Sequence, residues 1–486
     1  MSQRFLVRAR AAKRPLKRQL SWLEGLRVLA AVSILLYHAQ LLFTDYAYTP
    51  QPDGWQRNWV AIKEASDSLG DNGFVQAMAL PVWFGFQAVD VFVLMAGFVL
   101  VLSLRRRTQS SSAGEFIWRR LLRILWPFWT VTWLIYPILW TIGLVTDSYR
   151  PAPWDIFAGV TFPLLFDFNA QTLLNTNGSW WFIPLAISFA LISPVLWYLI
   201  RRWGGTTLWL VSLLITVLYR YGAVYGFGGH LTYALVETPN DWLPFVSFLA
   251  KLSTFVVGMA MADAYCDRRG PLFWRPQRLV LVGLLLYTLG FIAQFYQLGW
   301  VVCDLLLPVG LVMGLVVVLR SLTRSPVVSA ALRRLGAHSY SYFLIHGFVI
   351  DRTINLWVQG NLFRYWLSLP LMLVGTLALA MIADGIRPFI QRSVLHLWRD
   401  IDHLLALNPG TDLCRWMPVV GDRVSYQRSR DWIVLQVETL LDDGETYLCQ
   451  ISNGQQTLWA NADRLRRLEA EKTTRTSAYA SIKTVV

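Results

Sequence analysis

A basic residue and a histidine lie eleven positions apart in the first apolar stretch of the chain. Eleven positions make close to three helical turns, so Arg27 and His38 share one helix face, about 16 Å apart along the axis. Glu24 precedes Arg27 by three residues and can pair with it. An imidazole can take a proton near neutral pH, and a guanidinium binds phosphate. The spacing therefore predicts a proton-accepting group aligned with an anion-binding cation.

Both residues also have a structural interpretation. An arginine near a helix end commonly extends to the membrane surface, and a buried histidine can hydrogen-bond to a neighbouring span. For Arg27 the two interpretations stay open. For His38 we favour a functional role, because ionisable groups inside apolar spans are costly and mark function by default.

Further polar residues interrupt later apolar stretches. A buried carboxylate at Asp90 needs a partner; it either orients a histidine or arginine across the bundle or forms a salt bridge that holds helices together. Asp304 poses the same question. Ser339, Tyr342 and His346 follow an i, i+3, i+7 pattern and so share a helix face. This stripe either reaches the site or makes hydrogen bonds between helices.

The elements that carry these residues are apolar and long. The chain has 486 residues, of which 55% are hydrophobic and 15% charged, and its mean hydropathy is +0.42. Soluble domains carry about 25% charged residues, and a bilayer-spanning helix needs about 20 apolar ones. The composition therefore predicts an all-α polytopic membrane protein with about ten transmembrane helices. The expected spans are 22–43, 79–104, 119–144, 180–200, 206–222, 244–264, 278–296, 300–319, 339–358 and 366–390.

The charges predict the orientation of these spans. The net charge is +14, and the basic clusters fall in residues 1–20 and in alternate loops. Basic loops face the cytoplasm, so an even number of spans places both termini there, in a plasma (inner) membrane. Topology explains the charge without a nucleic-acid partner.

The four cysteines show no metal-ligand spacing, so we expect no metal.

The C-terminal region has a different pattern. Residues 405–469 are more polar, and Asp443-Gly444 and Asn453-Gly454 lie between β-prone runs, which is a hairpin signal. We predict a small cytoplasmic SH3-like β-barrel here, after a transmembrane domain at 21–395. Residues 470–486 are expected to be a disordered tail, and residues 1–20 a basic cytoplasmic N-terminus.

Six short motifs occur in a fixed order over about residues 20–395, and together they resemble the acyltransferase type 3 family of ten-span membrane enzymes. Any one of them is weak, and it is the ordered set that carries the resemblance. The motifs are Leu23 to Arg27 with Tyr37-His38, Asp90 to Phe98, Phe116 with Arg119 to Ile124, Trp181-Phe182 with Pro194, Phe255 to Met259, and Gly336 to His346.

The resemblance implies an acyl-CoA co-substrate, often acetyl-CoA, and an acceptor hydroxyl on a carbohydrate or lipid-linked glycan. His38 is suited to be the general base; Arg27, Glu24 and Asp90 complete the expected catalytic group. No bound cofactor is expected, and the lipid bilayer is the surrounding partner. The residues expected to bind substrate or donor are Arg119, Arg120, Arg123, Trp181, Ser339, Tyr342 and His346.

The chain departs from the family pattern at several positions. Ala88 and Ala96 stand where many members have Gly and Ser, and Ala186 stands where many have Glu. Ile386 precedes Arg387-Pro388 in place of a Glu, with Asp384 nearby. These departures are typical of a divergent branch.

Two other functional classes are alternatives for a chain of this composition. Another class of membrane acyltransferase carries an Asn and a His about 30 residues apart in apolar segments, and no convincing pair of that kind occurs here. A non-enzymatic transporter or scaffold for a glycan or lipid often shows two related halves, and no clear internal repeat is visible. Thioester turnover that depends on His38 would separate an enzyme from a transporter.

Overall fold

The structure is a computed structural model of the chain, and it describes residues 21–69, 79–106, 112–148, 150–153, 178–229, 243–404, 418–426, 429–439, 447–462 and 465–467. The chain divides into two compact units, Met1–Ile390 and Gln391–Val486. The predicted basic N-terminus at 1–20 and the predicted tail at 470–486 lie outside the described residues, and the predicted domain boundaries stay predictions.

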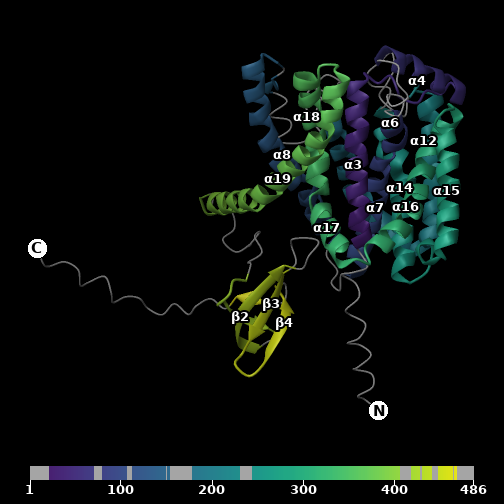
Figure 1. Cartoon of the computed structure of the whole chain (residues 1–486). Helices are drawn as coiled ribbons and strands as arrows, with labels where there is room; N and C mark the ends of the chain where they lie inside the picture. Colours follow the sequence, from purple (N-terminus) through teal and green to yellow (C-terminus); the bar gives the residue numbers. More distant parts are fainter. Residues whose placement is uncertain are drawn as a thin grey trace, which may run out of the picture. The chain divides into compact units, whose positions relative to one another are not determined.

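The first unit is helical (Figure 1). Its α-helices are α3 (Ser21–Phe43), α4 (Trp55–Leu69), α6 (Ala79–Gly85), α7 (Ala88–Arg106), α8 (Ala113–Thr146), α11 (Phe182–Trp203), α12 (Gly205–Tyr225), α13 (Leu243–Val246), α14 (Phe248–Cys266), α15 (Pro276–Ala293), α16 (Cys303–Leu322), α17 (Pro326–Ala337), α18 (Ser339–Thr353) and the part of α19 (Leu362–Leu404) up to Ile390. Short 3-10 helices are η2 (Gly178–Trp181), η3 (Pro271–Phe273) and η4 (Leu298–Val301), and η5 (Ile354–Val358) is a π-helix.

The helices confirm a multi-pass membrane protein. Among the described residues, nine helices are long and apolar enough to cross a membrane. The predicted span at 339–358 is not one of them, because it consists of the 15-residue α18 followed by the five-residue π-helix η5. The other nine predicted spans each overlap one of these helices. The count of ten therefore becomes nine long helices and one divided helix.

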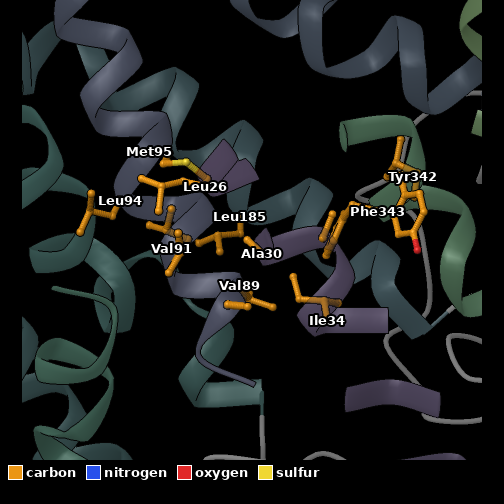
Figure 2. Packing of buried hydrophobic residues seen from close by; sticks show 14 of the residues in the cluster. Leu26, Ala30, Ile34, Val89, Val91, Leu94, Met95, Leu185, Tyr342 and Phe343 are labelled. Carbon is orange, nitrogen blue, oxygen red and sulfur yellow. The ribbon is translucent and has the colours of Figure 1, made fainter. Parts of the chain in front are cut away.

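Helix α3 is the central element of the first unit, in contact with α6, α7, α16, α17 and α18. Ile34 and Leu35 on α3 are fully buried. By contrast, α15 is mostly exposed, with Leu281 69% and Leu285 57% exposed. Apolar side chains that point out of a bundle suit lipid rather than water. Figure 2 shows the packing around α3, with labelled residues Leu26, Ala30, Ile34, Val89, Val91, Leu94, Met95, Leu185, Tyr342 and Phe343.

Glycines bring α7 and α14 into close contact. A Cβ atom on Gly97 would collide with the carbonyl group of Phe255, and one on Gly258 would collide with the carbonyl group of Leu94. Small residues at such crossings let membrane helices approach backbone to backbone. Two of the six motifs therefore have a packing role, and their contact places α14 directly beside α7.

The second unit contains a five-stranded antiparallel sheet with the order β4-β3-β2-β1-β5. The strands are β1 (Arg423–Tyr426), β2 (Ser429–Thr439), β3 (Tyr447–Ser452), β4 (Thr457–Asn461) and β5 (Arg466–Arg467). Val424, Val434, Cys449 and Ile451 form its buried core.

The predicted hairpin at Asn453-Gly454 is confirmed, because it joins β3 to β4 with Gly454 at a φ of 85°. The Asp443-Gly444 turn lies outside the described residues. A small C-terminal β domain is thus present, and its SH3-like character stays a prediction.

Candidate functional site

The two histidines singled out in the sequence meet between α3 and α18. The Nδ1 atom of His38 lies 2.9 Å from the Nε2 atom of His346. The other nitrogen of His346, Nδ1, lies 2.5 Å from the carbonyl oxygen of Phe343, one turn earlier on α18. His346 is 1% exposed, whereas His38 is only partly buried. His38 therefore points toward α18 inside the bundle.

Aromatic side chains surround the histidine pair. The ring of Tyr37 lies 4.9 Å from that of His38, and the ring of Phe343 lies 5.4 Å from that of His346. Phe182 packs edge-on against Phe343 at 5.1 Å. These aromatic side chains are largely apolar, which favours exclusion of water from the region around the imidazoles.

The structure distinguishes two adjacent tryptophans in η2, directly before α11. Trp181, the predicted binding residue, is partly buried and contacts Phe182 edge-on. Trp180 was not predicted, yet it is 1% exposed and its Nε1–H group donates to the carbonyl oxygen of Leu344 at 3.0 Å. This bond ties η2 to α18 next to the histidine pair. The Trp-Trp dipeptide was the only sequence signal, and it does not tell which ring turns inward.

The other two members of the polar stripe on α18 behave differently. The hydroxyl of Ser339 donates to the carbonyl oxygen of Gly336 at 2.8 Å, so it serves the start of the helix. The hydroxyl of Tyr342 is buried and has no hydrogen-bond partner among the described residues. Tyr342 precedes His346 by four residues, which places both side chains on one helix face. A buried tyrosine hydroxyl normally finds a partner, so Tyr342 has an unused donor on this face.

Glu24 and Arg27 pair as their spacing indicates. The guanidinium of Arg27 lies 2.9 Å from the carboxylate of Glu24, and the side chains are 29% and 16% exposed. Gly336 packs directly against Glu24, so a Cβ atom there would meet the carboxylate. The ion pair therefore lies where α3 contacts the end of α17, near the first turn of α3, whereas His38 lies near its last turn.

Asp90 belongs to a buried charge network that joins α7, α12, α14 and α16. Lys251 on α14 lies 2.9 Å from Asp90 and 2.7 Å from Asp304 on α16. Arg220 on α12 lies 3.0 Å from Asp304 and donates to the carbonyl oxygen of Trp300 at 2.5 Å. Two carboxylates and two cations balance in charge. The partner of Asp90 is thus a lysine that the sequence analysis did not single out.

The predicted arginine cluster lies on the first turns of α8. Arg119 forms an ion pair with Glu115, and Arg120 follows it on the same helix. Arg123 is partly buried, and its Nε atom has no hydrogen-bond partner among the described residues. The hydroxyl of Tyr340 on α18 donates to the carbonyl oxygen of Ile124 at 3.2 Å, which fixes α8 against α18. Among the described residues, Arg123 has no hydrogen bond or ion pair with His38.

A polar cluster around the carboxylate of Asp384, which the sequence analysis did not predict, connects α18 to α19. The carboxylate of Asp384 is hydrogen-bonded to the Nδ1 atom of His338 at 2.7 Å, to the hydroxyl of Ser341 at 2.7 Å and to the guanidinium of Arg387 at 3.0 Å. Its side chain is 8% exposed, whereas Ile386 is 39% exposed. Asp384 is therefore the buried acid in this segment, two positions before the place where the family pattern has Glu.

Comparisons with known proteins identify the family of this chain. A family model described as "Acyltransferase domain" matches residues 20–385. The chain is also 27% identical over 332 residues to "Acyltransferase MdmB" of Streptomyces mycarofaciens, an alignment that covers 62% of this chain and 77% of that protein. No solved structure matches the chain. The matched region runs from the start of α3 through Asp384 and so contains the histidine pair, the charge network and the Glu24–Arg27 pair. The chain belongs to the acyltransferase type 3 family and is a membrane acyltransferase.

Proposed function

We propose that the protein moves an acyl group, acetyl in the first instance, from acyl-CoA to a hydroxyl of a sugar, glycan or glycolipid, with His38 as the general base. The observation that carries this proposal is the place of His38. Its imidazole lies between α3 and α18 inside the bundle, and its Nδ1 atom faces the Nε2 atom of His346 at 2.9 Å. An imidazole held in this way suits proton transfer near neutral pH.

A single base accounts for every proton transfer in this reaction. The acceptor oxygen forms a bond to the thioester carbonyl carbon as its proton passes to His38. The carbon–sulfur bond then breaks, and His38 returns the proton to the departing thiolate, so that free CoA and an ester are the products. The aromatic residues around the pair limit access of water, which would otherwise compete as an acceptor.

The remaining predicted residues fit supporting roles. Arg27 binds the phosphates of the acyl-CoA donor, and Glu24 orients the guanidinium of Arg27. Arg119, Arg120 and Arg123 supply further positive charge on α8. The unpartnered hydroxyl of Tyr342 is available to donate to a substrate oxygen on the face that carries His346. We assign Asp90 a part in holding α7, because its partner is Lys251 rather than a group of the site.

The test uses purified protein in lipid nanodiscs with acetyl-CoA and a mixture of glycans, and measures free thiol release and acetylated products. His38→Ala is expected to lower acetyl transfer by about 10²- to 10⁴-fold, which is the usual contribution of a general base. His396→Ala is the matched control, because His396 is exposed on α19. Equal transfer by wild type and a folded His38→Ala variant would refute the proposal.

The acceptor can be identified independently of the purified assay. Surface glycans and lipids of a deletion strain are compared by mass spectrometry with those of the same strain carrying the wild-type gene. A molecule that loses one acyl mass in the deletion strain and regains it with wild type, but not with His38→Ala, is the acceptor.

A further inference from the structure

The donor and acceptor roles in the hydrogen bonds of the histidine pair determine which nitrogen of His38 carries the proton. We propose that His346 is a positioning residue that fixes the His38 imidazole in the tautomer whose Nε2 atom is free to take a proton. This inference rests on the proposed role of His38 as general base. It gives His346 a role that acts through His38 rather than through contact with substrate.

The direction follows from the last acceptor in the chain of bonds. A carbonyl oxygen only accepts, so the Nδ1 atom of His346 that faces Phe343 carries a proton. A neutral imidazole holds one proton, so the Nε2 atom of His346 has a lone pair and accepts. The Nδ1 atom of His38 therefore donates across the 2.9 Å contact. The proton on Nδ1 leaves the Nε2 atom of His38 as the basic nitrogen.

The neutral state of His346 follows from its surroundings. His346 is 1% exposed, and its two nitrogens face a carbonyl oxygen and a second imidazole, neither of which is an anion. A charged group without a counter-ion is costly in an apolar interior. The neutral form, with the single proton on Nδ1, is therefore favoured.

The geometry is held by packing on both sides. Helix α18 packs along α3, and the indole of Trp180 donates to the carbonyl oxygen of Leu344 next to the pair. When His38 takes a proton at Nε2, its Nδ1–H group becomes the donor of a charge-assisted bond to His346, which is stronger than a neutral one. His346 thus orients the free base and stabilises the protonated one.

Two substitutions separate this role from a merely structural one. His346→Leu removes the acceptor, whereas His346→Gln keeps a carbonyl oxygen that can accept from the Nδ1–H group of His38. We expect His346→Leu to lower kcat by about 10- to 100-fold, by analogy with the loss found when the group that orients a metal-binding histidine is removed, with little change in the KM for acetyl-CoA. His346→Gln is expected to keep most of the activity.

The double variant His38→Ala/His346→Leu tests whether the two histidines act as one unit. Residues that act through one another have strongly non-additive effects, so the double variant is expected to be no slower than His38→Ala alone. Multiplied losses would overturn the inference, and so would a folded His346→Leu variant with wild-type kcat. Wild-type activity of His38→Ala would instead refute the general base itself, so the two failures are distinguishable.

The tautomer can also be read without any substrate. The chain has six histidines, so solid-state NMR of protein labelled with ¹⁵N-histidine is tractable, with His38→Ala used to assign the His38 signals. We expect His38 to carry its proton on Nδ1 in the wild type and in His346→Gln. In His346→Leu the proton is expected to distribute over both nitrogens. A wild-type His38 protonated at Nε2 would overturn the inference, even where the leucine variant folds poorly.

Discussion

The buried charge network makes a quantitative prediction about stability. The side chains of Arg220 and Asp304 are 0% and 1% exposed, and those of Asp90 and Lys251 are 2% and 8% exposed. Removing one partner of a buried ion pair leaves an uncompensated charge and costs about 3–5 kcal/mol. Asp304→Asn leaves two cations and one carboxylate, and Arg220→Met leaves two carboxylates and one cation. Each single variant is therefore expected to lose about 3–5 kcal/mol of unfolding free energy.

The double variant Asp304→Asn/Arg220→Met behaves differently, because it removes one charge of each sign. The remaining network is Lys251 with Asp90, at 2.9 Å and neutral as a pair. Contacting residues commonly show interaction energies of about 0.5–3 kcal/mol. We expect the double variant to fall short of the sum of the single losses by about 1–3 kcal/mol.

The assay is reversible unfolding in mixed detergent micelles, followed by tryptophan fluorescence, with acetyl transfer measured on the same samples. Asp147→Asn is the control, because the Asp147 side chain is fully exposed. Single variants within about 0.5 kcal/mol of wild type, or strictly additive losses, would refute the interpretation of a balanced network. A stable Asp304→Asn variant that lost only acetyl transfer would instead assign the network to the chemistry.

Two further predictions concern the site. Tyr342→Phe removes a buried hydroxyl without a partner in the described structure; we expect equal or higher thermal stability, because an unsatisfied buried polar group costs about 1–3 kcal/mol, together with roughly tenfold slower acetyl transfer. Lower stability with unchanged transfer would contradict that role. Arg27→Ala is expected to weaken acetyl-CoA binding, measured by calorimetry, by about tenfold or more, since hydrogen bonds to charged groups are worth about 1.5–3 kcal/mol. Unchanged donor binding would make Arg27 structural.

Local spacing was enough to predict several features of the fold. The lengths and charges of the apolar runs predicted nine of the long helices. The i, i+3 spacing of Glu24 and Arg27 predicted their ion pair. Both depend only on helix geometry and on the cost of burying charge, so they can be inferred from a short window of sequence.

Partners that are distant in sequence could not be inferred in this way. His38 and His346 are 308 positions apart, and their contact depends on how α3 and α18 pack. The partner of Asp90 is 161 positions away. A signal for that network did exist, because Arg220 and Lys251 are ionisable residues within predicted apolar spans, and such residues indicate a buried partner. The division of the ninth predicted span into α18 and η5 depends on backbone geometry that hydropathy does not report.

The most direct measurement is a single-turnover experiment on protein preloaded with radiolabelled acetyl-CoA, in which label transfer to the acceptor is timed for wild type and His38→Ala. If the imidazole on α3 removes the acceptor proton, both proteins bind the donor with similar Kd, and the variant transfers label at least about 10²-fold more slowly. Matching time courses for the two proteins, at matched occupancy, would contradict the proposed mechanism.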